Sequence, residues 1–392
     1  MAILKSGIRA AAFLVCLSAA SFATATAEES WTIAAAERPL ADGSPILETV
    51  WTAARPPGGA FDRIGLHRYR AAGEPVATLL YLPGTNMNGA LALTDEAHNL
   101  WLFLAARGVE VFALDYRTHA VPADASPDAL AAMKDWDSAV FVDDIRAAAA
   151  KARAESGRAK LFVAGFSRGA FLAYAYANIE PEAVAGLVIL DGPFKAYAPK
   201  ERVDRAAAVA ALAASGEWAS DVGGSRGWEA RQQLMRAVIA DPNGPASDPA
   251  FKTIGAQLAH VLQTAWGPGA LANPEGCASD PAVLARLLVG YDRYYPAVQD
   301  IDGKAISSEA DAPDTALDDR WGRLEIPVLL FANTGMGAEW VLTALYSAAH
   351  AGSKDVTFAV LEGYGHLDVL VGERAAADVF DPTLAWIRAR AQ

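Results

Sequence analysis

The fold is decided by the stretch Lys160-Leu-Phe-Val-Ala-Gly-Phe-Ser-Arg-Gly-Ala-Phe-Leu-Ala-Tyr-Ala-Tyr-Ala177. Its apolar run at 161–164 predicts a buried strand, and residues 168–178 predict a helix. Between them lies a G-x-S-x-G motif, with the serine at position 167. A serine at a tight strand-to-helix turn holds its hydroxyl clear of the sheet edge, and flanking glycines permit the close backbone approach that such a turn needs. The motif alone occurs by chance in many loops, but the strand and helix around it favour Ser167 as a nucleophile.

Around this motif, short apolar runs alternate with longer helical patterns. The predicted strands are 77–82, 109–114, 161–164, 184–190, 326–331 and 356–361, and the predicted helices between and after them are 99–107, 137–156, 168–178, 338–349 and 375–391. Strands that are almost wholly apolar and alternate with helices indicate an α/β protein whose mostly parallel central sheet is flanked by helices on both faces. In such sheets the active site lies at the carboxyl ends of the strands.

The alternation stops near Pro193 and resumes at Ile326. Helical patterns joined by Pro/Gly turns fill the interval, at 206–215, 228–240, 251–266 and 282–291. We therefore expect a helical cap, residues 193–325, inserted after the sixth strand when 77–82 is counted as the third. The catalytic core then consists of residues 28–192 and 326–392.

The N-terminus, residues 1–27, has the pattern of a secretory signal peptide. Lys5 and Arg9 precede an apolar run that ends at Phe22, and Ala25-Thr-Ala27 resembles a cleavage site. The run is short for a bilayer span, which argues against the alternative of an uncleaved anchor. We expect an exported protein, periplasmic or secreted, with no stable membrane insertion after cleavage.

Cysteine usage and charge narrow the function further. Cys16 leaves with the signal, so Cys277 is the only cysteine of the mature chain; no internal disulfide can form, and we expect a passive thiol. The net charge is −13, from 33 basic and 46 acidic residues, and removal of Lys5 and Arg9 makes it −15. This charge argues against nucleic acid or an anionic membrane surface as a partner. The oligomeric state is not predicted.

A serine hydroxyl needs a base to remove its proton during attack. The chain has six histidines, His67, His98, His119, His260, His350 and His366. His366 follows the last predicted strand in Glu362-Gly-Tyr-Gly-His366, so it lies on a loop at the same sheet edge as Ser167. We predict His366 as the base, and His119 could line the pocket from another loop at that edge.

The acid that orients the histidine is harder to place. The loop after the strand at 326–331 contains no aspartate, only Asn333 and, further on, Glu339. Asp191, at the end of the preceding strand, is our preferred acid; Glu339 is the alternative and Asp368 the third candidate. The alternative explanation for Asp191 is a purely structural role, as a turn residue at the end of the strand.

Acyl transfer also needs hydrogen-bond donors for the developing oxyanion. One predicted donor is the backbone N–H of Arg168, directly after the nucleophile, and the other is the N–H of Thr85 in the loop at 82–89. Asn86 and Asn88 of this loop either contact substrate or stabilise the turn. The sequence shows neither metal-ligand spacing nor a phosphate-binding glycine loop, so no metal or cofactor is expected.

Taken together, the chain resembles the α/β-hydrolase family. The residues that carry the resemblance are Pro83-Gly-Thr85, Leu114-Asp-Tyr-Arg117, Gly165-Phe-Ser-Arg-Gly169 and Gly363-Tyr-Gly-His-Leu-Asp368, in the chain order Ser…Asp…His. The segment 365–372 is similar to the histidine segment of acid-lipase-like members. The chain departs from the family in lacking an aspartate after the seventh strand.

The resemblance implies hydrolysis of a carboxylic ester of a small-molecule acyl substrate, or of a related acyl bond, through an acyl-enzyme. Two alternatives remain open. The same triad could act on an amide, lactone or C–C bond or transfer the acyl group to an alcohol, and the fold could serve as a non-catalytic binding protein.

Overall fold

The computed structural model describes residues 31–391, apart from 42, 91–92, 199–201, 267–268, 274–275, 278 and 309–314. The predicted signal peptide and Cys16 lie outside these residues. Within them, no helix is long and apolar enough to cross a bilayer.

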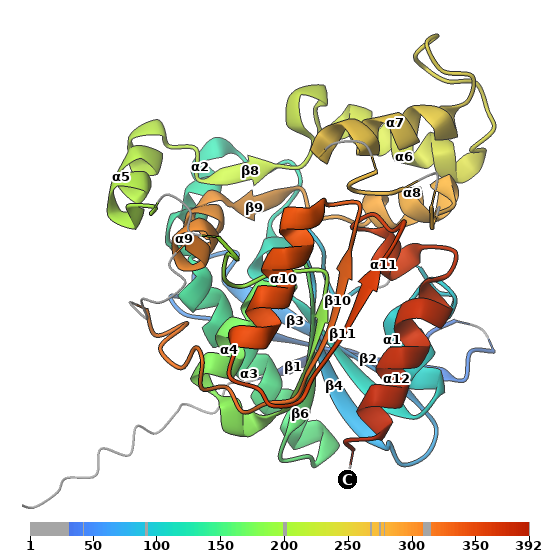
Figure 1. The fold of residues 1–392 in the computed structure, drawn as a ribbon. Coiled ribbons are helices and arrows are strands. Elements are labelled where there is room, and N and C mark those ends of the chain that lie inside the picture. Colours follow the sequence, from blue (N-terminus) through green and yellow to red (C-terminus); the bar gives the residue numbers. More distant parts are fainter. Residues whose placement is uncertain are drawn as a thin grey trace, which may run out of the picture.

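A nine-stranded sheet forms the centre of the molecule (Figure 1), in the order β1-β2-β3-β5-β4-β6-β7-β10-β11. Its strands are β1 Thr32–Pro39, β2 Ile46–Ala54, β3 Arg63–Ala71, β4 Ala77–Leu82, β5 Val109–Asp115, β6 Leu161–Phe166, β7 Val184–Leu190, β10 Val328–Asn333 and β11 Val356–Leu361. Strands β1 to β3 pair in antiparallel fashion and β3 joins β5 in the same way, whereas the pairs from β5 to β11 are parallel.

Helices cover both faces of the sheet, as predicted for strands that are apolar on both sides. Figure 1 shows α3 Ser138–Ser156, α4 Arg168–Ile179 and α10 Ala338–His350 on one face, and α1 Leu100–Ala106 and α12 Asp381–Arg388 on the other. Each face has its own cluster of buried apolar side chains. Shorter elements of the core include the helical turns α2 Pro127–Leu130 and α11 Asp368–Val371, the 3-10 turns at 117–120, 131–135 and 181–183, and the π-helical turn at 376–380 that leads into α12.

The ends of α3 show how the local sequence sets an element. Asp137 caps the helix, with Oδ1 accepting a hydrogen bond from the backbone N–H of Val140 at 3.0 Å. Gly157 ends it with φ 67°, a left-handed conformation that glycine adopts without a steric penalty. The helix therefore occupies the predicted range almost residue for residue.

The N-terminal strands were not all predicted. Three strands precede β4 rather than two, so the insertion follows the seventh strand in chain order, β7, instead of the sixth. The strand β1 is mostly exposed at the sheet edge, and its short apolar run at 33–36 is mostly alanine, which is depleted in strands and gave no strand signal.

The segment after β7 lies over the carboxyl ends of the strands (Figure 1). It contains α5 Arg205–Ser215, β8 Ala219–Asp221, α6 Trp228–Ala240, α7 Ile254–Trp266, α8 Pro281–Val289, β9 Tyr294–Pro296 and α9 Ala297–Ser308. The helix α9 and the small β8–β9 sheet were missed because residues 294–308 mix polar and apolar residues without a clear period.

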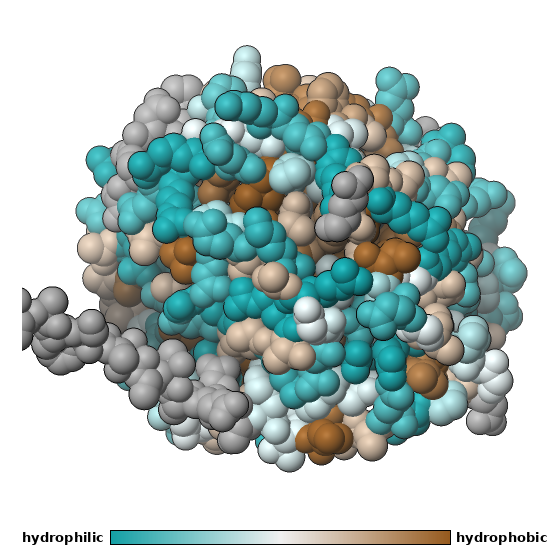
Figure 2. Space-filling view, turned by 90° about the horizontal axis from the view of Figure 1, so that it is seen from below, coloured by the Kyte–Doolittle hydropathy of each residue, from teal (hydrophilic) through white to brown (hydrophobic). Residues whose placement is uncertain are grey.

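The face of the molecule opposite the inserted segment is mainly hydrophilic, with hydrophobic residues in small separate patches (Figure 2).

Candidate active site

Ser167 stands at the turn between β6 and α4, with φ 55° and ψ −118°. A non-glycine residue at positive φ is strained, and such strain concentrates at functional sites. The turn is held by hydrogen bonds from the N–H of Ser167 to the carbonyl of Leu190 at 3.0 Å and from the N–H of Ala170 to the carbonyl of Ser167 at 3.0 Å. This geometry is that of a nucleophile elbow.

The two glycines of the motif are required by contact distance. A Cβ atom at Gly165 would lie 2.2 Å from the carbonyl oxygen of Gly169, and one at Gly169 would lie 2.0 Å from that of Leu82. No side chain fits at such distances, so the helix α4 approaches the strands only because both positions lack one.

His366 lies on the loop after β11 with its ring against the acid at the end of β7. The Nδ1 atom of His366 contacts a carboxylate oxygen of Asp191, which is completely buried. The aromatic ring of Phe166, next to Ser167 in the chain, lies 4.6 Å from the imidazole ring, centroid to centroid. The structure therefore brings together His366 and the preferred acid from the sequence, whereas Glu339 is exposed in the first turn of α10.

Asn333 and Trp340, which were not predicted as site residues, complete the surroundings of the Asp191 carboxylate. The backbone N–H of Asn333 donates to Asp191 Oδ1 at 3.1 Å, its side-chain amide donates to Oδ2, and Trp340 Nε1 donates to Oδ1 at 2.9 Å. Asn333 ends β10, where the family usually places its acid, so here that position supplies an amide that binds the acid from the neighbouring strand. The absence of an aspartate after this strand was the sequence signal that could have pointed to an unusual residue at this position.

Asp368 anchors the histidine loop and does not contact the imidazole. Its Oδ2 accepts the backbone N–H groups of Gly365 and Asn273, each at 2.7 Å, and its Oδ1 accepts the hydroxyl of Ser279 at 2.6 Å. Burial raises the pKa of Asp368, and the hydrogen bonds to it act in the opposite direction. The carboxylate fixes the loop that carries His366.

The residues of the two predicted oxyanion donors, Thr85 and Arg168, flank the nucleophile. Thr85 and Asn86 are the central residues of a turn closed by the N–H of Met87 and the carbonyl of Gly84 at 3.0 Å, with Asn86 at φ 63°. Within the described residues, the backbone N–H groups of Thr85 and Arg168 form no hydrogen bond. Both residues line the same cavity as Ser167.

That cavity has a volume of about 1160 Å³ and lies between the sheet edge and the inserted helices. Ser167 and His366 both line it, and His366 is the only one of the six histidines to do so. Among the described residues neither the Ser167 hydroxyl nor His366 Nε2 has a hydrogen-bond partner, so the two groups share the cavity without a hydrogen bond between them. Catalytic hydrogen bonds are often long in free enzymes and shorten with substrate.

Asn86 and Asn88 bind the cap. The Asn86 side chain donates to the carbonyl of Asp292 at 2.9 Å, and the N–H of Asp292 donates back to the carbonyl of Asn86 at 2.7 Å. Asn88 donates to the carbonyl of Gly290 at 3.0 Å and to Asp292 Oδ1 at 3.1 Å. The loop of Thr85 is therefore held against the segment between α8 and β9.

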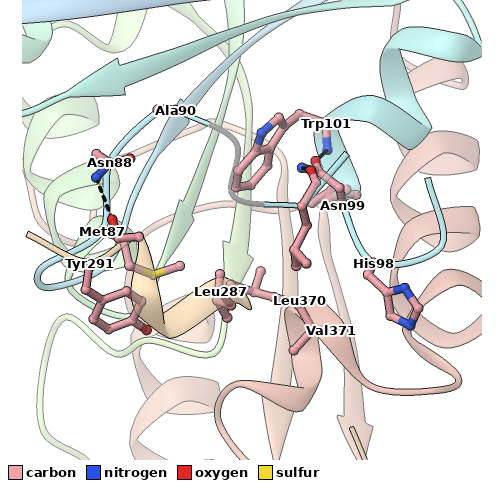
Figure 3. Close-up of a pocket in the computed structure, with 13 residues that line it drawn as sticks. Met87, Asn88, Ala90, His98, Asn99, Trp101, Leu287, Tyr291, Leu370 and Val371 are labelled. Carbon is pink, nitrogen blue, oxygen red and sulfur yellow. Dashed lines mark hydrogen bonds between the residues drawn. The ribbon is translucent and has the colours of Figure 1, made fainter. Parts of the chain in front are cut away.

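A smaller pocket, of about 40 Å³, is lined in part by Met87, Asn88 and Ala90 of this loop and the residues after it (Figure 3). Figure 3 shows Met87 and Tyr291 together at one side of it and Trp101 and His98 at the other. Met87 and Tyr291 line the large cavity as well. They therefore separate the two spaces.

His119 and Cys277 lie outside the site. His119 does not line the large cavity; its hydrogen bond to Asp292 at 2.8 Å outweighs its burial and raises the pKa of the imidazole to about 9. Cys277 is a buried free cysteine whose sulfur accepts the backbone N–H of Arg374 at 3.5 Å. No group of three or more His, Cys, Asp or Glu side chains in the described ranges could hold a metal ion.

The sheet order, the strained serine turn and the histidine loop are those of the α/β-hydrolase fold. A family model described as serine aminopeptidase S33 matches residues 87–246, which include Ser167 and Asp191 and stop short of His366. No curated protein sequence matches the chain.

Three solved structures show the same architecture. A candidate lipase from Sulfolobus solfataricus is 24% identical with a TM-score of 0.76, and the match covers 92% of this chain and 99% of that one. A thermostable carboxyl esterase from Bacillus coagulans is 13% identical with a TM-score of 0.51, covering 88% and 99% of the two chains. A soluble variant of monoglyceride lipase from Saccharomyces cerevisiae is 12% identical with a TM-score of 0.51, covering 91% and 95%. At these identities the likeness establishes the fold.

Proposed function

We propose that the protein is a serine hydrolase that cleaves a carboxylic ester through an acyl-enzyme. The observation that carries the proposal is the arrangement of Ser167 on a strained turn, His366 in the same cavity, and a buried Asp191 against the Nδ1 atom of that histidine. A buried carboxylate that accepts Nδ1–H leaves Nε2 unprotonated, and an unprotonated Nε2 is what a general base requires.

In the proposed reaction, Ser167 Oγ attacks the carbonyl carbon while His366 Nε2 takes the hydroxyl proton. The carbonyl electrons move to oxygen, where the N–H groups of Thr85 and Arg168 stabilise the negative charge. Collapse of this intermediate breaks the ester C–O bond, and the imidazolium gives its proton to the leaving alcohol. Water then attacks the acyl-enzyme, with His366 as the base again, and releases the acid.

The related family model raises a second candidate, cleavage of an N-terminal amide bond. An aminopeptidase must bind a positively charged α-amino group, which favours carboxylates near the nucleophile. Among the described residues that line the cavity, Asp300 is the only carboxylate, and it forms an ion pair with Arg168 at 3.0 Å. This lining favours the ester over the aminopeptidase substrate.

The test is labelling with a fluorophosphonate probe, which modifies only an activated serine. We expect the wild-type protein to be labelled and to hydrolyse p-nitrophenyl butyrate, and Ser167→Ala and His366→Ala to lose both properties while keeping the wild-type circular dichroism spectrum. A folded wild-type protein that takes no label would instead support a non-catalytic binding function. Product analysis in the presence of glycerol separates hydrolysis from acyl transfer to an alcohol.

Export is a second part of the proposal, supported by the sequence pattern of residues 1–27. Expression of the full chain should give a protein in the periplasmic or culture fraction whose N-terminus, read by Edman degradation, is Glu28.

A further inference from the structure

The large cavity has two chemically different ends. The helices α6, α7 and α8 contribute the apolar side chains Leu234, Met235, Ile254, Val261, Leu262 and Leu288. The helix α9 contributes Asp300, Lys304 and Ser307, next to Arg168 from the nucleophile turn. Figure 1 shows α9 and the group α6–α8 over opposite ends of the sheet edge. Arg231, Gln233 and Gln257 also come from α6 and α7, so a substrate that fills the cavity meets a mainly apolar surface between α6, α7 and α8 and charged groups from α9 and Arg168.

The charged groups in the cavity are mostly cations, in contrast to the acidic chain that surrounds them. The described lining residues include Arg168, Arg226, Arg231 and Lys304 against the single carboxylate of Asp300. In the whole chain, 33 basic residues stand against 46 acidic ones. The excess of positive charge is thus a property of the cavity and not of the average surface.

Two of the cations are already bound within the protein. Arg168 forms its ion pair with Asp300, and its guanidinium lies against Gly303 of α9, where a Cβ atom would be 2.1 Å from Nη1. Arg231 donates to the carbonyl of Leu288 at 2.8 Å and lies 5.4 Å from the ring centroid of Tyr291. Glycine at position 303 is thus what allows the Arg168 side chain to lie along the wall of the cavity.

The other two cations have no such partner. Lys304 and Arg226 are exposed to solvent within the cavity, and neither forms an ion pair or a side-chain hydrogen bond in the described part of the chain. Unpaired cations held by separate elements, α9 and the turn before α6, are free to bind an anionic group that enters the cavity.

We propose that the substrate is an amphiphilic ester that carries an anionic group, bound near Lys304 and Arg226, and an apolar portion bound between α6, α7 and α8. This inference rests on the proposed esterase function and adds the substrate class. The chemistry recognised is a carboxylate or another singly charged anion, located on the acyl part or on the alcohol part of the ester.

The test compares anionic and neutral esters in two arms. In the first arm the acyl part carries the charge, with the p-nitrophenyl monoester of suberic acid against p-nitrophenyl octanoate. In the second arm the leaving group carries it, with 4-octanoyloxybenzoate against methyl 4-octanoyloxybenzoate. The quantity measured is the ratio of kcat/KM for the anionic to the neutral ester, and comparing variants with wild type cancels the intrinsic reactivity of each substrate.

We expect Lys304→Gln and Arg226→Gln each to lower this ratio about two- to fivefold in at least one arm, as is typical of single exposed charges. The double variant should lower it by about the product, and 0.5 M NaCl should reduce the ratio in the wild type. Lys252→Gln is the matched control, because Lys252 is an exposed lysine outside the cavity and should leave the ratio at its wild-type value.

An unchanged ratio in the double variant, in both arms, would overturn the substrate class. Fluorophosphonate labelling and turnover of the neutral esters would still report on the esterase itself. Failure of the anionic subsite and failure of the catalytic proposal therefore give different results.

Discussion

The Asp191→Asn variant tests the catalytic arrangement most directly. In the wild type, Asp191 Oδ1 accepts from Asn333 N–H and Trp340 Nε1, and Oδ2 accepts from the Asn333 amide and His366 Nδ1. An amide at position 191 keeps one acceptor, so its NH₂ group faces two donors. The histidine responds by placing its proton on Nε2, and in that tautomer the ring cannot take a proton from Ser167.

The size of the effect follows from the interactions lost. A charge-assisted hydrogen bond contributes about 1.5–3 kcal/mol, and a buried donor left facing another donor costs about 1–3 kcal/mol. The sum, about 2.5–6 kcal/mol, corresponds to a loss of about 10² to 10⁴ in kcat. The fold should tolerate the change because asparagine has the same shape.

The assay is kcat for p-nitrophenyl butyrate at pH 8, with circular dichroism to confirm folding. Glu339→Gln is the matched control, since Glu339 is the other carboxylate that the sequence offered and is exposed on α10; we expect nearly wild-type kcat. If Asp191→Asn kept kcat within tenfold of wild type and Glu339→Gln lost it, the assignment of the acid would be refuted.

Two further predictions concern stability and acyl-chain preference. Burial lowers the pKa of His67, but hydrogen bonds and charges of Asp115 and Glu48 outweigh it and raise the pKa from 6.5 to about 9. The resulting stabilisation, at most about 3 kcal/mol, is fully present below pH 6.5 and is lost as the pH rises through 9. The free energy of unfolding, measured by urea titration, should therefore be lower at pH 9.5 than at pH 6 in the wild type. The difference between the two pH values should be smaller in His67→Gln. An equal difference in both proteins would contradict the raised pKa of His67. Met87→Ala removes part of the wall between the large cavity and the small pocket, so kcat/KM for p-nitrophenyl dodecanoate relative to the butyrate should rise severalfold. An unchanged ratio in a variant that remains folded would mean that Met87 does not limit chain length.

The sequence predicted the elements whose signals are local. The strand β7, Val184–Leu190, is an uninterrupted apolar run, and α3 has a capping aspartate and a terminal glycine; both have the predicted bounds to within one residue. The edge strand β1 lacks such a signal because its apolar run is mostly alanine, which is depleted in strands, and the helix α9 lacks one because it mixes polar and apolar residues. Their positions depend on pairing with distant parts of the chain.

The candidate site shows the same division. The turn at Ser167 is encoded by five consecutive residues, so the sequence alone could identify it. The choice between Asp191 and Glu339 depends on which carboxylate the sheet brings to the His366 loop, and that is a contact over 175 positions in the chain. The amide of Asn333 could not be recognised as a partner of the acid because its role exists only through the pairing of β7 with β10.

The attachment of the inserted segment to both loops of the site has a consequence for how this protein can diversify. Residues 270–273 bind the loop of His366, through the N–H groups of His366 and Leu367 to the carbonyls of Ala270 and Leu271 at 2.7 and 2.8 Å. Residues 290–292 bind the loop of Thr85 in a similar way. Mutations in these two short segments are expected to disturb the reaction itself, whereas α6 and α7 can change the side chains that line the cavity and alter only which substrates are accepted. New specificities are therefore expected to arise in those helices while the two anchoring segments stay constant.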